Sequence, residues 1–307
     1  MDVSIILVSY NTKNLTKECI KSIYEKTNGL SYEIWVVDNA SSDGSVEMLQ
    51  QEFPEVKLIA SKENLGFGKA NNVAIKQSYA KYCLLLNTDT VLLNNAVKIF
   101  FDFMENPENI NVGACGGQLY NADMSNQLSF GEFNDIEKLK RKALGIDQNV
   151  IRHRINRFFE KKVKGNQNYI YDARGRIGEV DYIIGADLML RKSALDKAGI
   201  FDEIFFMYGE ESELQFRIKK HGYNIKIIPD AKILHYGGAS SANKNKQLDV
   251  EKMLLKGNIN FFKLCYGQDA AKKAKFYYII YYLRYFALRF FAPKAFSRLK
   301  TALELEI

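Results

Sequence analysis

The sequence predicts an α/β fold built on a doubly wound, parallel sheet. Short apolar runs alternate with helix-like segments roughly every 20 to 30 residues, which is typical of strand–helix–strand units. The apolar runs end abruptly in polar loops, and open sheets of this class bind ligands at the carboxyl ends of their strands. With 307 residues, 47% of them apolar, the chain can form one large α/β domain with appendages or two small domains.

The first strand is expected at Val3–Tyr10, which is rich in Val, Ile and Leu. Asn14 is a suitable N-cap for a helix that reaches about Thr27. The second strand, Tyr32–Asp38, ends in a polar loop that can cap a short helix before Pro54. Val56–Ala60 is the third strand, and the loop after it opens a further helix.

The fourth strand, Tyr82–Leu86, is a short apolar run of the kind that is buried on both faces of a sheet. Another helix begins at Asn94. From 121 to 178 the periodicity weakens, which indicates an irregular, partly helical insert. Further strands are expected at Asn111–Tyr120, within Val180–Arg191, at Tyr223–Ile228 before Pro229 and at Ala231–His235, and helices at Glu211–His221 and from about Lys246 to Phe262.

Composition narrows the class of protein. The four cysteines are scattered without CxxC spacing, which indicates reduced core thiols in the cytosol and neither a disulfide framework nor a zinc site. The first residues are strand-like and lack a basic region, so no signal peptide is expected. The sequence contains no run of about 20 uncharged apolar residues, so no membrane span is expected.

Basic residues gather in two segments of a chain whose net charge is +7. Lys138–Lys164 holds ten Lys or Arg against two acids, and Ala270–Leu303 holds eight and no acid. These segments predict contact with an anionic surface or acceptor. No helix-turn-helix, RRM or zinc-finger pattern supports nucleic acid as that partner.

The C-terminal tail is aromatic as well as basic, with nine aromatic residues in Phe276–Phe291. Aromatic rings interleaved with Lys and Arg suit the headgroup region of an anionic bilayer. We therefore expect peripheral membrane contact through a C-terminal helical tail. The alternative is a helix packed on the sheet or in a dimer interface.

Asp89 follows the fourth strand, where a carboxylate can hold a divalent cation and the cation a diphosphate. The ordinary alternative is a turn, because Asn, Thr and Asp also end strands. Asp38 ends the second strand, and its carboxylate can accept the N3–H of uracil or thymine. The alternative is that Asp38 simply caps the next helix. Backbone groups from Ser9 to Asn11 can contact the base or the ribose.

Gly66 and Gly68 allow close approach of backbone to a sugar or phosphate, and Lys69 brings a cation to a helix N-terminus. This loop matches neither GxGxxG nor a Walker motif, so a dinucleotide enzyme or a P-loop ATPase is disfavoured.

Three acids, Glu210, Glu211 and Glu213, begin a helix after an apolar run. Crowded carboxylates there can raise one another's pKa toward the range of a general base, although acids also favour helix N-termini for dipole reasons. His235 follows a short strand, and an imidazole near an Asp favours Mn²⁺ over Mg²⁺ if it binds metal at all.

Taken together, these motifs resemble the inverting family 2 glycosyltransferases of GT-A fold, and the rhamnosyltransferase-like branch in particular. The resemblance covers about residues 3 to 240. It is carried by the ordered set Val8-Ser9-Tyr10-Asn11, Asp38 to Gly44, Asn64-Leu65-Gly66-Phe67, Leu86-Asn87-Thr88-Asp89, Gly199 to Glu203, Glu210-Glu211 and His235.

The resemblance implies a GT-A, Rossmann-like, doubly wound mixed sheet, and an enzyme that transfers a sugar from a nucleoside diphosphate sugar to an acceptor hydroxyl with inversion. It implies Glu211 as the base, with Glu210 as the alternative, and Mn²⁺ or Mg²⁺ held by Asp89 and His235. The nucleotide-binding residues would be Ser9, Tyr10, Asn11, Asp38, Asn39, Gly66, Phe67, Lys69, Asn87 and Thr88.

Two positions depart from the family pattern. The usual Asp-x-Asp metal motif has Asn87 as its first residue, which predicts weaker metal affinity. The usual Glu-Asp-x-Asp is Glu210-Glu211-Ser212-Glu213, which lengthens both distal acids by one methylene.

We therefore predict a metal-assisted transferase of surface polysaccharide synthesis, acting at the cytoplasmic face of the membrane on a glycan or lipid-linked acceptor. The donor is expected to be dTDP-rhamnose, with a UDP-hexose as the alternative; a non-catalytic membrane adaptor is a third hypothesis. The expected domains are residues 1–240, with a nucleotide-binding half at 1–120 and an acceptor-side half at 121–240, and a helical segment at 241–307. The oligomeric state is not indicated.

Overall fold

A computed structural model describes residues 1–146, 178–237, 244–288 and 293–306. Contacts divide the chain into two compact units, each described by itself below. The first comprises Met1–Phe133 and Ile170–Ala242, and the second comprises Asn134–Tyr169 and Asn243–Ile307.

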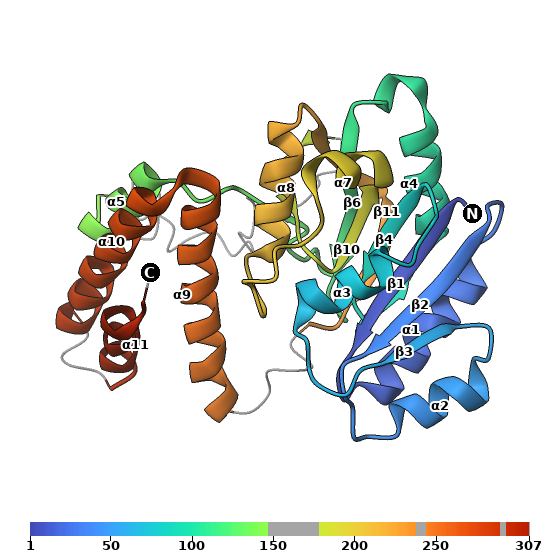
Figure 1. Cartoon of the computed structure of the whole chain (residues 1–307), viewed down its shortest axis with the longest axis horizontal. Helices are drawn as coiled ribbons and strands as arrows, with labels where there is room; N and C mark the ends of the chain where they lie inside the picture. Colours follow the sequence, from blue (N-terminus) through green and yellow to red (C-terminus); the bar gives the residue numbers. More distant parts are fainter. Residues whose placement is uncertain (147–177, 238–243, 289–292, 307) are drawn as a thin grey trace, which may run out of the picture. The chain divides into compact units, whose positions relative to one another are not determined.

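The first unit contains a mixed sheet of nine strands among its described residues (Figure 1). Their order is β3-β2-β1-β4-β10-β6-β11-β5, and β8 pairs with β11. The first four are parallel, whereas β10 runs antiparallel to both β4 and β6, and β5 runs antiparallel to β11. The strands are β1 (Val3–Ser9), β2 (Tyr32–Asp38), β3 (Lys57–Ala60), β4 (Tyr82–Leu86), β5 (Thr90–Leu92), β6 (Val112–Tyr120), β8 (Gly178–Glu179), β10 (Asp187–Arg191) and β11 (Asn224–His235).

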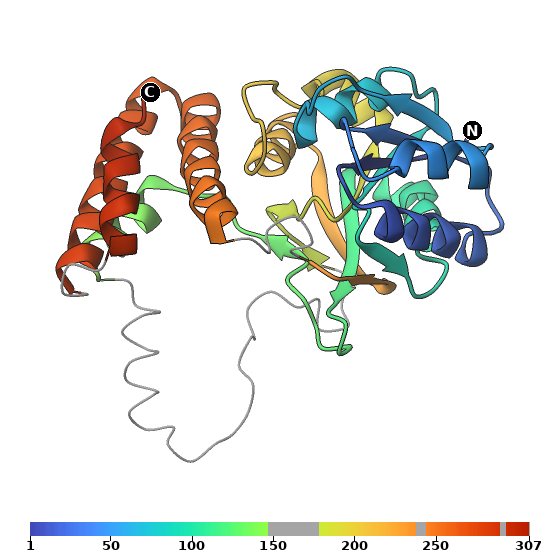
Figure 2. The same ribbon diagram turned by 90° about the horizontal axis from the view of Figure 1, so that it is seen from below.

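Helices cover both faces of this sheet because alternate residues of each strand point to opposite sides. Ile5 and Leu7 of β1 pack toward α1, α2 and α4, while Ile6 packs toward α3, α7 and α8. In Figure 2 the dark-blue α1 and the cyan α3 lie on opposite sides of the sheet. The helices are α1 (Lys13–Lys26), α2 (Ser45–Glu52), α3 (Phe67–Ile75), α4 (Ala96–Glu105), the 3₁₀ turn η1 (Pro107–Asn109), α7 (Lys192–Ala198) and α8 (Glu210–Lys220); a separate small ladder joins β7 (Phe130–Gly131) to β9 (Tyr182–Ile183).

This three-layer architecture confirms the predicted doubly wound mixed sheet. Strands β2 and β4 begin and end where expected, but β5 and α7 were not predicted. Two expected strands around Pro229 are one strand, β11, and that part of the prediction was wrong. The proline is accommodated by an irregularity, because the pairing of β11 with β6 shifts between Ile228 and Lys232.

A buried carboxyl group lies beside this irregularity. Asp187 on β10 is fully buried, and its Oδ2 accepts the backbone N–H of Gly117 at 2.6 Å. Gly117 is the last β6 residue paired before the shift. Burial raises the pKa of Asp187 well above its usual range, only partly offset by this hydrogen bond. Asp187 is therefore a buried hydrogen-bond acceptor that links β10 to β6 beside the irregularity.

Replacing Asp187 tests this role. Asp187→Leu leaves the Gly117 N–H without its acceptor, so we expect the free energy of unfolding to fall by about 1 to 3 kcal/mol. Asp187→Asn keeps an acceptor. Because the pKa of Asp187 is raised in the folded state, the folded protein keeps a proton that the unfolded chain loses above its ordinary pKa of about 4. Wild type should therefore lose stability relative to Asp187→Asn as pH rises above that value. Urea unfolding at several pH values measures the difference, and a constant difference would contradict the assignment.

The second unit is helical. The buried side chains Leu139, Leu255, Phe262 and Ala274 share one apolar cluster. The described helices are α5 (Ile136–Leu144), α9 (Lys244–Tyr266), α10 (Gln268–Leu288) and α11 (Pro293–Glu304). Within the described ranges, no helix is both long and apolar enough to cross a membrane.

Helix α5 lies in this second unit, whereas the expected domain limits placed residues 134–146 in the acceptor-side half. Leu139 and Ala143 of α5 are buried, and α5 packs against α10 within the second unit. The remainder of the predicted insert, 147–177, lies outside the described residues, as does the end of the aromatic tail at 289–291.

Candidate active site

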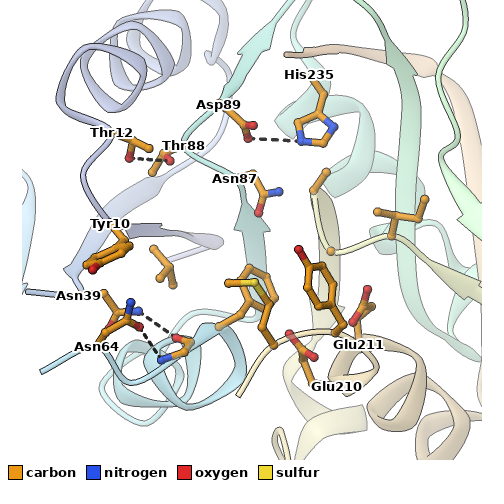
Figure 3. A pocket seen from close by; sticks show the side chains of 18 residues that line it. Tyr10, Thr12, Asn39, Asn64, Asn87, Thr88, Asp89, Glu210, Glu211 and His235 are labelled. Carbon is orange, nitrogen blue, oxygen red and sulfur yellow. Dashed lines mark hydrogen bonds and ion pairs between the residues drawn. The ribbon is translucent and has the colours of Figure 1, made fainter. Parts of the chain in front are cut away.

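A cavity of about 340 Å³ opens at the carboxyl ends of the central parallel strands in the first unit. Strands β1 and β4 end at its wall, and the N-terminus of α8 faces it (Figure 3). Ten of the candidate site residues from the sequence line this cavity: Tyr10, Asn39, Gly66, Phe67, Asn87, Thr88, Asp89, Glu210, Glu211 and His235.

Asp89 and His235 form one wall of the cavity. Asp89 lies between β4 and β5, and His235 ends β11, where it pairs with Thr90. The Tyr236 N–H donates to the Asp89 carbonyl at 2.9 Å, which fixes the two chain segments together. His235 Nε2 is 3.3 Å from Asp89 Oδ1, and the two side chains are 15% and 14% exposed.

This pair suits a divalent cation that also binds the substrate. Among the described residues, no group of three or more His, Cys, Asp or Glu side chains is arranged for metal. The protein offers one carboxylate and one imidazole here, and phosphate oxygens, water and the neutral Asn87 side chain would be available as further ligands of such an ion. Mg²⁺ is commonly held by one or two carboxylates plus substrate phosphates, and the imidazole makes Mn²⁺ a suitable ion as well.

The loop after β4 is held by one backbone hydrogen bond and one contact between side chains. The Asn87 N–H donates to the Ala186 carbonyl at 3.0 Å, and the Thr88 and Thr12 hydroxyls are 3.1 Å apart. The Asn87 side chain lines the cavity beside Asp89 and can still add a neutral oxygen there.

Gly66 is required by a close approach of two loops. Its φ is +78°, and a Cβ at this position would lie 2.1 Å from the Phe206 carbonyl oxygen. That same oxygen accepts the Phe67 N–H at 2.9 Å. Asn39 supports the loop, because its Nδ2 donates to the Gly66 carbonyl at 2.9 Å and its Oδ1 accepts from the Leu65 N–H. A sugar or phosphate was expected to approach the Gly66 backbone closely. In the structure the Phe206 carbonyl makes such a close approach.

Four predicted nucleotide residues lie outside the cavity lining: Ser9, Asn11, Asp38 and Lys69. The Ser9 hydroxyl contacts Thr12 and Thr16, and Asn11 Oδ1 accepts the Ser42 N–H. Asp38 Oδ1 accepts the Ser41 N–H at 2.9 Å, which is the local turn considered above. Its buried Oδ2 has no hydrogen-bond partner among the described residues, so it retains an acceptor.

Glu210 and Glu211 form the opposite wall of the cavity in the view of Figure 3. Tyr208 and Gly209 have φ of +73° and +100°, and this sharp turn starts α8 so that both carboxylates face the cavity. Burial and the neighbouring charge of Glu211 raise the pKa of Glu210 to about 8, and burial raises the pKa of Glu211. The buried Oε2 of Glu210 has no partner in the described part of the chain.

The third acid of this cluster is structural. Glu213 is buried, and its carboxylate accepts two hydrogen bonds from Arg217 at 2.6 and 2.8 Å. Arg217 also donates to the Ala198 and Ile200 carbonyls and thereby ties α8 to the end of α7. The acids at 210, 211 and 213 therefore separate into a cavity pair and a structural ion pair.

Thr12, Met207 and Tyr208 are among the lining residues that sequence reasoning did not select. Thr12 comes directly after the motif that ends at Asn11. Its hydroxyl contacts that of Thr88, which is 76 residues away in the sequence. Met207 and Tyr208 are separated from the acidic pair by Gly209 alone. The positive φ of Tyr208 has no sequence signal, because this conformation is uncommon for a non-glycine residue.

The sheet order, the antiparallel β10 and the cavity at the strand ends define the GT-A class of glycosyltransferase fold. The model of the family "Glycosyl transferase family 2" matches residues 4–199. The chain therefore belongs to this family, as the sequence motifs indicated.

Similar proteins and structures agree with this assignment. The low-salt glycan biosynthesis hexosyltransferase Agl10 of Haloferax volcanii is 27% identical over 224 residues, 73% of this chain and 64% of the relative. The N-acetylglucosaminyl-diphospho-decaprenol L-rhamnosyltransferase of Mycobacterium tuberculosis is 23% identical over 222 residues, 68% of this chain and 67% of the relative.

The chain spans about two thirds of the length of these two relatives, and 19% of the poly(ribitol-phosphate) beta-glucosyltransferase of Bacillus spizizenii, to which it is 32% identical over 123 residues. Among solved structures, the mannosyltransferase PcManGT of Pyrobaculum calidifontis, in complex with GDP-Man and Mn²⁺, superposes with a TM-score of 0.53. It is 15% identical, and the match covers 98% of this chain and 84% of that one, which supports the fold.

Proposed function

We propose that this protein is an inverting, metal-assisted glycosyltransferase that moves a sugar from a nucleoside diphosphate sugar to an acceptor hydroxyl during glycan synthesis. One observation carries the proposal: Asp89 and His235 share a single cavity with Glu210 and Glu211. A cation site and a pair of carboxylates with raised pKa are the two parts that such a reaction needs.

In the proposed reaction the acceptor oxygen attacks the anomeric carbon of the donor sugar. Glu211 takes the acceptor proton as the new C–O bond forms, and the bond from the anomeric carbon to the diphosphate breaks. The products are the glycosylated acceptor and the nucleoside diphosphate. A divalent cation, when bound at Asp89 and His235, would stabilise the negative charge of the leaving diphosphate. Asp38, through its free Oδ2, is the proposed acceptor for a pyrimidine N3–H.

The donor is proposed to carry a 6-deoxy sugar, such as rhamnose on dTDP. Phe67, Ile184 and Met207 line the cavity that also contains the carboxylates, and such apolar side chains suit a methyl group better than a hydroxymethyl group. The similarity to a rhamnosyltransferase points the same way. A UDP-hexose is the competing donor, favoured by the similarity to a hexosyltransferase.

Thermal unfolding with dTDP-, UDP- and GDP-sugars, each with and without Mn²⁺, tests the function and the donor together. We expect stabilisation by one nucleotide class only, and a larger stabilisation with metal than without it. A ligand at about 100 times its Kd adds about 2.7 kcal/mol to the free energy of unfolding. Equal shifts with all nucleotides, or none, would contradict the proposal.

The pH dependence of transfer provides a further test. Burial raises the pKa of Glu211, so the ionised base is depleted at a higher pH than for an ordinary glutamate, after Glu210, whose pKa is raised to about 8, has taken up its proton. We expect kcat/KM to fall about tenfold per unit below the pKa of the pair. A rate that stays level down to about pH 4.3, the ordinary pKa of a glutamate, would rule out a base with a raised pKa.

We also propose that the second unit contacts the cytoplasmic face of a membrane, where a lipid-linked acceptor would be found. Phe276 and Leu283, seven residues apart on α10, are 59% and 48% exposed, and Lys272 lies one turn before them on the same side of the helix. On α11, Phe296 and Leu303 are 55% and 56% exposed. Exposed apolar side chains beside Lys suit an anionic bilayer surface.

Sedimentation with lipid vesicles tests this contact. We expect the protein to pellet with vesicles containing anionic lipid and to remain in solution with zwitterionic ones. Phe276→Ser with Leu283→Ser should lower the bound fraction severalfold. Tyr79→Ser is a matched control, because Tyr79 is 95% exposed in the first unit. Equal pelleting of the double variant and wild type would exclude α10 as the contact.

A further inference from the structure

Gln127 contacts the ring nitrogen of His235 that faces away from Asp89. Its Oε1 is 2.7 Å from His235 Nδ1, while the other ring nitrogen, Nε2, is 3.3 Å from Asp89 Oδ1. Gln127 does not itself line the cavity. The imidazole therefore lies between a side-chain amide behind it and the cavity carboxylate in front of it.

Two contacts set the orientation of this amide. Gln127 Nε2 donates to Asn121 Oδ1 at 3.0 Å and to the His235 carbonyl at 3.3 Å. Both of these atoms accept hydrogen bonds and neither donates, so the amide nitrogen must face them and Oε1 must face the imidazole. An amide oxygen only accepts, so the proton of the contact belongs to His235 Nδ1.

The backbone around Gln127 is fixed as well. The Gln127 N–H donates to the Leu119 carbonyl of β6 at 2.8 Å, and the Gln127 carbonyl accepts from the Ser129 hydroxyl at 3.2 Å. A Cβ placed on Gly237 would lie 3.3 Å from Gln127 Nε2, so the chain after His235 packs closely on the amide. The loop after β6 thus holds Gln127 in one position.

We propose that Gln127 is a positioning residue that keeps the proton of neutral His235 on Nδ1 and presents Nε2, with its lone pair, to a cation shared with Asp89. This inference rests on the proposed function in one respect, namely that Asp89 and His235 hold a divalent cation. Partners of this kind fix the ring and its tautomer in metal-binding histidines, and their loss typically weakens metal binding about 10- to 100-fold.

Equilibrium binding of Mn²⁺, followed by the loss of the free-ion electron paramagnetic resonance signal, tests the inference without measuring transfer. Titrations contain saturating UDP in one series and saturating dTDP in another. Gln127→Met keeps the size of the side chain and removes the acceptor, so its Kd for Mn²⁺ should rise about 10- to 100-fold. Gln127→Glu retains an acceptor for Nδ1–H but loses the donor to Asn121 and to the His235 carbonyl, so its Kd should rise less than that of Gln127→Met.

Two controls separate positioning from a general disturbance of the loop. Leu128→Ala removes a 49% exposed neighbour and should leave Mn²⁺ binding unchanged. Nucleotide binding in EDTA should be the same for wild type and Gln127→Met. If wild type binds no Mn²⁺ with either nucleotide, the metal part of the proposed function is wrong and this inference with it. If wild type and Gln127→Met bind equally, only the role of Gln127 is overturned.

Nitrogen-15 spectra of the histidine side chains test the tautomer itself. The chain has three histidines, and a His235→Gln spectrum identifies the signals of His235. At a pH where the ring is neutral, we expect Nδ1 to carry the proton in wild type and in Gln127→Glu. In Gln127→Met the population should shift toward Nε2–H. A wild-type ring protonated on Nε2 would overturn the proposal whatever the Mn²⁺ data show.

Discussion

Glu211→Gln is expected to lower the rate of sugar transfer by about 10²- to 10⁴-fold, because an amide cannot accept the proton of the acceptor hydroxyl. The change keeps the size of a side chain that lines the cavity at the start of α8. Binding of the nucleotide with Mn²⁺ should be unaffected, since Asp89 and His235 lie on the other wall of the cavity. Initial rates and thermal shifts on the same preparations measure both quantities.

Two variants on the same helix provide the comparison. Glu210→Gln shows which carboxylate is the base, and a smaller loss than in Glu211→Gln supports Glu211. Glu213→Gln weakens the pair with Arg217, so it should reduce stability and leave the rate per folded molecule close to that of wild type. If Glu211→Gln transfers sugar as fast as wild type, the assignment of Glu211 as the base is wrong. If Glu210→Gln is fully active as well, neither carboxylate of the cavity is the base.

Asp89→Ala is expected to abolish the metal-dependent part of nucleotide binding and to reduce transfer at least about 10³-fold, because the proposed cation loses its carboxylate ligand. His235 alone would remain on the protein side, and a single imidazole holds Mn²⁺ weakly. Thermal shifts with the stabilising nucleotide, with and without Mn²⁺, measure the effect. The shift without metal should be the same as that of wild type.

Asp43→Ala is a matched control for this variant. Asp43 is also a loop carboxylate in the first unit, but its oxygens accept from the Lys13 and Ser45 backbone N–H groups. Its loss should lower stability modestly and leave the response to Mn²⁺ intact. An Asp89→Ala protein that still responds fully to Mn²⁺ would remove Asp89 from the metal site.

The parallel half of the sheet was predictable because its strands are buried on both faces and appear in the sequence as continuous apolar runs. Strands β2 and β4 have the predicted bounds for this reason. Strand β5 has three residues and exists only through its pairing with β11, so no local pattern marks it. Pro229 suggested a break, but a shift in pairing with β6 absorbs it.

The candidate site was predictable where the carboxyl ends of parallel strands meet, as at Asp89. The structure adds how distant residues converge there. Gln127 lies in a stretch without periodicity, and its contact with His235 joins residues 108 positions apart. The different surroundings of Glu210, Glu211 and Glu213 likewise depend on Arg217 and on the turn at Tyr208, which a run of acids does not reveal.

The backbone contact between Phe206 and the Gly66–Phe67 loop has a consequence for interpreting mutations. The Gly66–Phe67 loop, which is proposed to contact the nucleotide, and the segment that leads into the acidic pair meet without a side chain between them, so a shift of one displaces the other. Any side chain added at Gly66 would push on the turn that aims both carboxylates. Such a protein would bind its donor poorly and also lose chemistry, although no proton-transferring group had been altered.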